Sequence, residues 1–92
     1  MVNFEWDSGK ELFNIHKHKV DFWTARSVFQ DPNRHIYKDS KHGMTEERYH
    51  CVGKVGDHIL TVRFVYRGER IRIIGAGYWR KGKKLYEKRK KG

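Results

Sequence analysis

The segment that decides the fold is residues 70–86, which read RIRIIGAGYWRKGKKLY. Its first four residues alternate arginine with isoleucine, a period of two that is typical of a strand with one apolar and one cationic face. Gly75 and Gly77 are expected to end that strand, and a Tyr-Trp pair and a basic run follow. Guanidinium groups beside aromatic rings suit phosphate and nucleobase recognition. A solvated edge strand with a basic tail is the alternative interpretation.

The composition indicates that the protein binds a partner that carries negative charge. The 92 residues suffice for one domain with a modest core, and 37% hydrophobic residues favour a folded chain over a disordered one. The net charge of +10 is uneven, because residues 79–92 alone hold eight basic residues and one acidic residue. Such a distribution predicts nucleic acid, an anionic membrane or an acidic protein as the partner.

Several features favour a cytoplasmic protein without a membrane partner. Cys51 is the only cysteine, so no disulfide can form within the chain, which fits a reducing compartment, although a bacterial periplasm is also compatible. We expect Cys51 to be a small buried hydrophobe. No stretch approaches the length of a membrane span, and the first six residues lack the basic and apolar regions of a signal peptide.

The first third of the chain predicts a strand and two helices. The strand is expected at residues 2–6, and the helices at residues 8–18 and 22–29. Asp7 or Ser8 is the expected cap of the first helix. The tight link between the helices suggests a helix-turn-helix, but the second helix bears only one basic residue, so we disfavour reading of DNA bases.

From residue 34 the pattern changes to a period of two. It predicts four further strands, at residues 34–38, 46–52, 58–66 and 69–76. Short turns between the last three make the sheet antiparallel. The tail from Tyr78 has helical spacing, but Gly82 costs it about 1 kcal/mol relative to alanine, so we expect it to be helical only when docked. The fold class is therefore α+β, in a single domain over residues 1–92.

The last hairpin is expected to bring three arginines close together on one face of the sheet. A two-residue loop at Arg67-Gly68 places Arg63 opposite Arg72, with Arg70 on the same face. Like charges directly opposed across strands destabilise a sheet, so this register favours a bound anion. A three-residue loop would shift the pairing and remove the argument.

Residues 39–48 supply groups suited to RNA cleavage through the 2′-hydroxyl. That reaction needs a base for the hydroxyl proton, an acid for the leaving 5′-oxygen and a cation for the transition state. Histidine titrates in the right range, which makes His42 a candidate acid or base. Glu46 could act as base or orient it, and Arg48 and Arg72 could hold the phosphate. A structural ion pair between Glu46 and Arg48 is the competing interpretation.

Other classes of function have less support. The six histidines show no ligand spacing paired with the cysteine, so we expect no metal site. The sequence has no phosphate-binding glycine loop, and residues 80–92 offer only Leu85 and Tyr86 as apolar membrane anchors. Two alternatives to an enzyme stay open. One is a non-catalytic RNA- or DNA-binding module, and the other is a protein whose basic face docks an acidic segment.

An ordered set of motifs extends along residues 4–87. The set comprises Phe4-Glu5-Trp6-Asp7, Lys10, Asn14, Lys17-His18, Val20, Phe22, Ala25, Val28-Phe29, Asp31-Pro32, Asp39, His42, Glu46, Arg48, Gly53, Arg70-Ile71-Arg72-Ile73-Ile74, Ala76 and Tyr86-Glu87. It resembles the BrnT family of type II toxins, small ribonucleases with a RelE-like fold. The resemblance implies a bacterial toxin that cuts RNA without a metal or other cofactor and inhibits translation.

The resemblance also implies the partners and the site. The partners are an RNA substrate and a BrnA antitoxin with a ribbon-helix-helix domain, which masks the toxin and alone contacts operator DNA. The implied catalytic residues are His42, Glu46, Arg48, Arg72 and Tyr86. For RNA binding we expect Arg63, Arg70, Trp79, Arg80, Lys83 and Lys84.

Three positions depart from the family's usual pattern. Lys19 stands where glycine usually follows Lys-His. Gly75 stands where many members have serine, and Gly77 where many have arginine. The two glycines put in doubt a catalytic role for the family's serine or arginine and shift the expected phosphate contacts toward Arg72 and Arg80.

Overall fold

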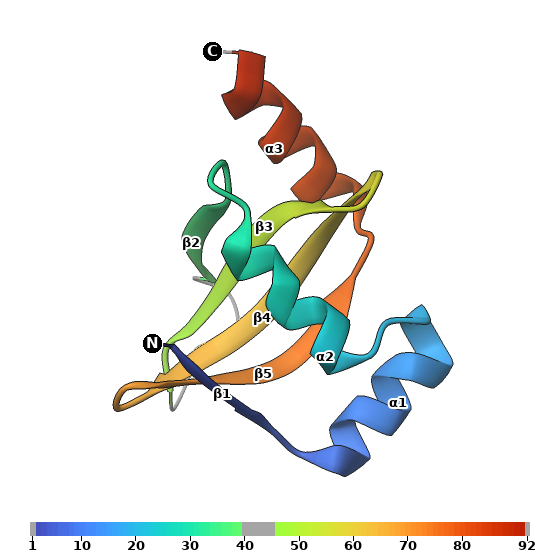
Figure 1. Cartoon of the computed structure of the whole chain (residues 1–92), viewed down its shortest axis with the longest axis vertical. Helices are drawn as coiled ribbons and strands as arrows, with labels where there is room; N and C mark the ends of the chain where they lie inside the picture. The colour runs from blue at the N-terminus through green and yellow to red at the C-terminus, as the bar shows by residue number, and fades with distance from the viewer. Residues whose placement is uncertain (1, 40–45, 92) are drawn as a thin grey trace.

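The structure is a computed structural model that describes residues 2–39 and 46–91. Its elements are β1 (Asn3–Trp6), α1 (Ser8–His18), α2 (Phe22–Ala25), the 3-10 helix η1 (Arg26–Gln30), β2 (His35–Asp39), β3 (Arg48–Val55), β4 (His58–Arg67), β5 (Arg70–Gly77) and α3 (Arg80–Lys91). The strands form one sheet in the order β1-β5-β4-β3-β2 (Figure 1). The α+β class is therefore confirmed.

The sheet is mixed, because the N-terminal strand belongs to it. Strands β2 to β5 are antiparallel neighbours, as predicted, whereas β1 runs parallel to β5 at the edge. Apolar residues of the two strands pair in register, Phe4 with Ile71 and Trp6 with Ile73. The pairing of residues nearly seventy positions apart was not part of the sequence prediction.

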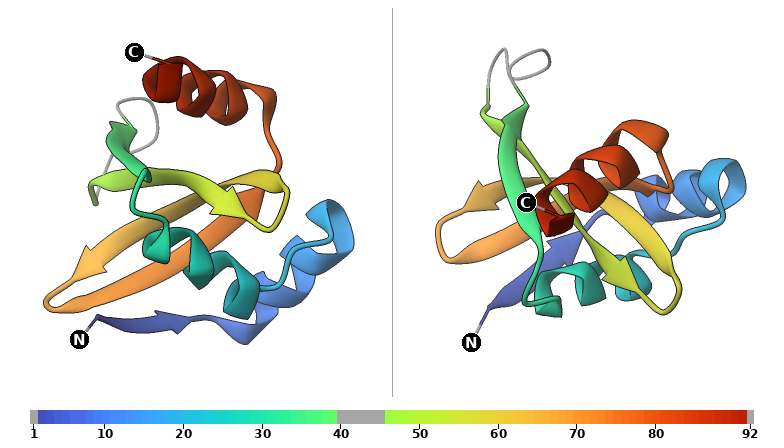
Figure 2. Two further views of the ribbon diagram at one scale, coloured as in Figure 1. Left: turned by 45° about the horizontal axis from the view of Figure 1, so that its top comes forward. Right: turned by 90° about the horizontal axis from the view of Figure 1, so that it is seen from above.

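The helices cover opposite faces of the sheet. Figure 2 shows α2 on one side and α3 on the other. The core lies between the sheet and α2 with η1, where Phe22, Val28 and Phe64 are fully buried. Cys51 also lies in this core, which confirms the expectation, and burial raises the pKa of its thiol to about 12. The other face is left for polar side chains and α3.

The two ends of α1 are set by single residues. Asp7, rather than Ser8, caps the helix, since its carboxylate accepts the Lys10 N–H at 2.9 Å. Glu11 accepts the Phe22 N–H at 2.9 Å and so ties α1 to α2. At the other end Lys19 adopts φ 61°, the left-handed conformation that favours glycine. Glycine would adopt this conformation at lower cost than lysine.

Asn14 fastens α1 to the sheet. Its buried side chain donates to the carbonyls of Val20 at 2.9 Å and Ala76 at 3.0 Å, and accepts from the Ala76 N–H at 3.1 Å. Strand β1 ends at Trp6, so Asn14 supplies the edge hydrogen bonds that a longer β1 would have made to β5. One amide therefore fixes the distance between α1 and β5.

The predicted register of the last hairpin is wrong. The loop is Gly68-Glu69, so Arg67 pairs with Arg70 and Val65 with Arg72. A β-bulge then shifts the register between Arg63 and Phe64, which places Arg63 opposite Gly75. The expected opposition of Arg63 and Arg72 does not occur.

Of the two glycines expected to end β5, only Gly77 does so. Gly75 lies inside the strand, Gly77 is its last residue, and both are buried. A β-carbon at Gly75 would lie 2.7 Å from Arg63 Nη2, and one at Gly77 would lie 2.6 Å from the Trp79 ring. The glycines therefore make room for these two side chains, and Gly75 does so without breaking the strand.

The C-terminal segment is a helix docked on the sheet, in line with the expectation. Helix α3 packs on β3 and β4 (Figure 1). Gly82 of this helix faces the side chain of Thr61. A β-carbon at position 82 would overlap the Thr61 hydroxyl. The glycine that weakens the isolated helix therefore permits its close approach to β4.

This contact reverses the usual effect of glycine in a helix. We predict that Gly82→Ala lowers the free energy of unfolding by roughly 1–3 kcal/mol through overpacking, although alanine favours an isolated helix by about 1 kcal/mol. Urea unfolding followed by circular dichroism measures the change. The double variant Thr61→Ala/Gly82→Ala, which lacks the clashing hydroxyl, should recover most of the loss. A Gly82→Ala protein more stable than wild type would contradict the packing.

Candidate nucleic-acid interface

A row of polar side chains crosses the sheet on the face opposite α2. Tyr37 of β2 pairs with His50 of β3, His50 pairs with Arg63 of β4, and Arg63 pairs with Gly75 of β5. Directly opposed residues share one face of a sheet, with β-carbons about 4.5–5.5 Å apart. The row therefore brings a phenol, an imidazole and a guanidinium side by side.

The guanidinium group of Arg63 is held in a fixed position. Its guanidinium lies over Gly75, and its Cζ is 5.5 Å from the centroid of the Trp79 ring. Its Nε is buried and has no hydrogen-bond partner among the residues that the structure describes. The Trp79 ring lies over Gly77 and meets His18 edge-on at 5.3 Å. Packing against Gly75 and Trp79 thus positions the arginine.

A cavity of about 460 Å³, here called the α1 cleft, opens between α1 and this face of the sheet. Its cationic lining residues are Lys10, Lys17, Arg48 and Arg63. Its acidic lining residue is Asp7, whose carboxylate already caps α1. The cleft therefore has a surplus of positive charge.

His18 completes the wall of the α1 cleft. Burial lowers the pKa of this histidine, and the nearby charges of Lys17 and Arg63 lower it further. The neutral imidazole is therefore favoured near pH 7. Lys10, Lys17 and His18 belong to the motif set described above, but their spacing on one helix does not show that they face Arg63.

A second cavity of about 300 Å³, here called the His50 cavity, lies on the other side of Arg63. Its lining residues are Tyr37, Asp39, His50, Thr61, Arg63, Trp79, Lys81 and Gly82. Arg63 lines both cavities. A ligand held on this guanidinium can therefore reach either one.

His50 is hydrogen-bonded through both ring nitrogens. Its Nε2 lies 3.1 Å from Asp39 Oδ2 and its Nδ1 lies 3.0 Å from the Tyr37 hydroxyl. The imidazole is 19% exposed and the carboxylate 7%. Burial lowers the pKa of His50, whereas Asp39 opposes this shift. From the sequence, His50 was weighed only as a possible metal ligand, because its pairing with Tyr37 depends on the strand register.

The catalytic residues predicted from the sequence do not gather in one place. His42 lies outside the described residues. Arg48 lines the α1 cleft together with Arg63, whereas Glu46 forms an ion pair with Arg67, its Oε2 lying 2.6 Å from Arg67 Nε.

Arg72 and Tyr86 are each engaged elsewhere in the fold. Arg72 Nη1 lies 2.8 Å from Glu5 Oε2, and the hydrogen bond from Arg72 is the main reason that the pKa of Glu5 is lowered. The buried Tyr86 hydroxyl donates to Asp31 Oδ2 at 2.6 Å, and burial raises its pKa to about 12. Arg72 therefore joins β5 to β1. Tyr86 joins α3 to Asp31, the residue that follows η1.

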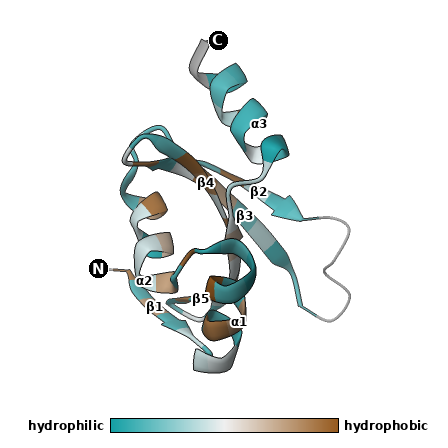
Figure 3. Cartoon of the chain, turned by 90° about the vertical axis from the view of Figure 1, so that its right-hand side faces the viewer, coloured by the Kyte–Doolittle hydropathy of each residue, from teal (hydrophilic) through white to brown (hydrophobic). Residues whose placement is uncertain are grey.

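The residues expected to bind RNA also lie at different places in the fold. Arg63 and Trp79 line the His50 cavity, whereas Arg70 lies 3.4 Å from Glu5. Arg80 and Lys84 are exposed on α3, whose surface is hydrophilic (Figure 3).

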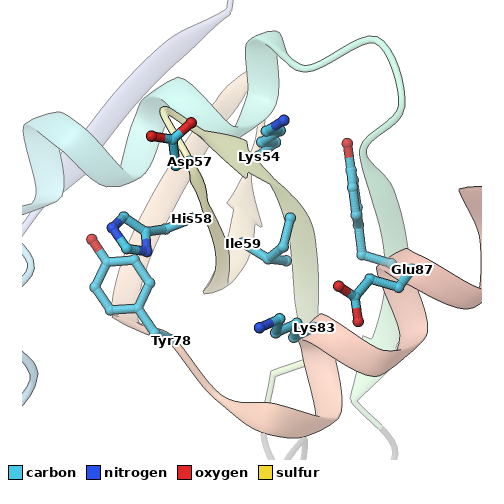
Figure 4. Close-up of a pocket in the computed structure, with 8 residues that line it drawn as sticks. Lys54, Asp57, His58, Ile59, Tyr78, Lys83 and Glu87 are labelled. Carbon is cyan, nitrogen blue, oxygen red and sulfur yellow. The ribbon is translucent and has the colours of Figure 1, made fainter.

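Lys83 faces a different cavity of about 430 Å³ between α3 and the β3–β4 hairpin (Figure 4). Its lining includes Lys54 and His58 together with the carboxylates of Asp57 and Glu87. The opposing charges balance there, so this cavity attracts phosphate less than the α1 cleft does.

Two classes of feature are not found in the part of the chain that the structure describes. Among residues 2–39 and 46–91, no group of three or more His, Cys, Asp or Glu side chains is arranged to hold a metal ion. None of the helices in these ranges has the length and apolar character needed to cross a membrane.

Comparison with known proteins identifies a family. A family model described as "Ribonuclease toxin, BrnT, of type II toxin-antitoxin system" matches residues 6–82, which run from the end of β1 into the first turn of α3. The match covers the α1 cleft and the His50 cavity. No curated protein matches the chain. The family resemblance inferred from the motifs is confirmed.

The Tyr86–Asp31 bond predicts a structural contribution of Tyr86 to stability. Tyr86→Phe removes a hydrogen bond to a carboxylate, so the free energy of unfolding should fall by roughly 1.5–3 kcal/mol, as measured by urea unfolding. Tyr66→Phe is the matched control, because Tyr66 is about half exposed and should change stability little. Equal stability of Tyr86→Phe and wild type would contradict the anchoring of α3 by this hydroxyl.

Proposed function

The chain belongs to the BrnT family of type II toxin–antitoxin ribonuclease toxins, and we propose that it is a metal-independent endoribonuclease that inhibits translation by cleaving RNA. The observation that carries the proposal is the α1 cleft. Four cationic side chains from α1, β3 and β4 converge there, and its acidic lining residue is already used as a helix cap. An RNA backbone is the polyanion that suits such a cleft.

Arg63 is the proposed centre of phosphate binding. A guanidinium presents donors in a planar fork that matches two phosphate oxygens. Arg63 already stands in place, held between Gly75 and Trp79. A fixed donor stabilises the charge that develops in the transition state without having to reorganise. Arg48, on the wall of the α1 cleft, supplies the second guanidinium.

The proposed chemistry is attack of the 2′-hydroxyl on the adjacent phosphate, which leaves a 2′,3′-cyclic phosphate and a 5′-hydroxyl. The nucleophile belongs to RNA itself, so the reaction needs no metal. Trp79 offers a ring on which a base can stack. His42 stays a predicted proton-transfer residue on sequence grounds alone. We assign Arg72 and Tyr86 supporting positions, because Glu5 and Asp31 already engage them.

The proposed partner is a BrnA-like ribbon-helix-helix antitoxin, through which alone the complex reaches operator DNA. Beside the α1 cleft, α1 exposes apolar side chains, with Leu12 68% and Phe13 64% exposed, and Figure 3 shows this hydrophobic colouring on the helix. An acidic segment with apolar anchors would cover both this surface and the cleft. A neighbouring reading frame for a small ribbon-helix-helix protein would support the assignment. Translation takes place in the cytoplasm, where we place the toxin.

We predict that Arg63→Gln lowers the rate of RNA cleavage by roughly 10²- to 10³-fold, the usual cost of losing one preorganised transition-state donor. The measurement uses EDTA-treated protein and an RNA oligonucleotide, with thermal unfolding as the check on folding. Arg70→Gln removes the same charge at the β1–β5 edge, where Glu5 is its partner. It should change the rate little at physiological salt.

Two results would contradict this proposal. If Arg70→Gln and Arg63→Gln lose the same activity, net charge matters and the placed guanidinium does not. If wild-type protein shifts RNA on a gel but leaves it intact, the function is that of a non-catalytic RNA-binding module. An oligonucleotide with a 2′-deoxyribose at the cleaved position is the substrate control and should resist cleavage while still binding.

A further inference from the structure

We propose that the His50 cavity holds the nucleotide whose 2′-hydroxyl attacks, and that Tyr37, His50 and Asp39 form the proton relay that activates it. The inference rests on the proposed ribonuclease function and assigns its first proton transfer. It concerns three side chains that neither the motifs nor the family match had assigned a role.

The hydrogen bonds set the direction of the relay. An ionised carboxylate can only accept hydrogen bonds, so the proton between His50 and Asp39 belongs to His50 Nε2. The lone pair of a neutral imidazole is then on Nδ1, which accepts from the Tyr37 hydroxyl 3.0 Å away. Tyr37 is thereby poised to pass its own proton to His50 and to accept another at its oxygen.

The cavity joins this relay to the phosphate-binding arginine. His50 and Arg63 are directly opposed on β3 and β4, and both line the same cavity of about 300 Å³, a size at the lower end of small-molecule pockets. Arg63 also lines the α1 cleft. A phosphate on Arg63 therefore places one flanking ribose in the His50 cavity, with Trp79 beside it as a stacking surface.

The surroundings of His50 suit a base. Among the residues that the structure describes, the charged and titratable groups that face it are Tyr37 and Asp39 on β2, Arg63 on β4 and Lys81 on α3. Burial, Arg63 and Lys81 lower its pKa, and Asp39 opposes them without reversing the shift. The imidazole is therefore neutral near pH 7. Once it has accepted a proton, Asp39 stabilises the imidazolium, as in other carboxylate–histidine pairs.

The step balances without any further reactant. The 2′-hydroxyl gives its proton to the Tyr37 oxygen while the Tyr37 proton moves to His50 Nδ1. The 2′-oxygen forms a bond to phosphorus, and the bond from phosphorus to the 5′-oxygen breaks. The leaving 5′-oxygen takes a proton from water, and His50 then returns one proton to solvent. The products are the 2′,3′-cyclic phosphate and the 5′-hydroxyl.

The test is the pH dependence of single-turnover RNA cleavage by wild type, His50→Gln and Tyr37→Phe. Wild type should lose activity as the pH falls through the lowered pKa of His50, because protonation removes the base. His50→Gln should cleave roughly 10²- to 10⁴-fold more slowly and lack this acid limb. Tyr37→Phe should slow cleavage comparably with unchanged RNA affinity. His58→Gln is the matched control, because His58 is exposed beside the cavity under α3.

The outcomes separate this inference from the proposed function. Cleavage by wild type, together with wild-type rates and pH profiles in both variants, overturns the relay while leaving the ribonuclease intact. A wild-type rate in Tyr37→Phe alone also overturns it, and this conservative variant stays informative if His50→Gln fails to fold. Wild-type protein that binds RNA without cutting it overturns the proposed function first, and the relay with it.

Discussion

The guanidinium of Arg63 lies over Gly75 at a distance that no β-carbon on the neighbouring strand would permit. The position is energetically unfavourable by itself, because the buried Nε of this cation lacks a hydrogen-bond partner among the described residues. An unsatisfied buried donor costs about 1–3 kcal/mol. Contact with Trp79 offsets part of this cost. A bound phosphate would supply the missing acceptors, so the same arrangement that costs stability prepares the site.

The surrounding fold keeps Arg63 in that position. The β-bulge between β4 and β5 sets Arg63 against Gly75 rather than against a residue with a side chain. Asn14 forms hydrogen bonds with both backbone groups of Ala76, the residue that follows Gly75. Helix α1, and with it Lys10 and Lys17, is therefore held at the same point of β5. The α1 cleft is the space between α1 and the strands β3, β4 and β5, and the buried hydrogen bonds of Asn14 fix the separation of α1 from β5.

Local patterns in the sequence were enough to predict the elements but not their contacts. Alternation predicted β2 to β5 within a few residues, and Asp7 predicted the start of α1. The loop of the last hairpin lies at Gly68-Glu69 rather than Arg67-Gly68, and a bulge shifts the register once more. Alternation reveals neither, so Arg63 was assigned the wrong partner. Glu5 pairs with Arg72 through a parallel contact between distant strands. His50 contacts Asp39 only because of the register between β2 and β3. The position of a histidine within a strand pattern does not predict that register.

The arginines of the sheet show why the number of charges does not locate a site. Arg70 and Arg72 share the carboxylate of Glu5, so an approaching phosphate meets a partly neutralised edge. Arg63 and Arg48 line a cleft whose acidic lining residue is occupied by the start of α1. The exposed cations of α3 act from further away, where salt screens them within about 10 Å at 0.1 M. They can raise the local concentration of RNA along the whole face, but only a cation with a fixed position can favour one phosphate over the next.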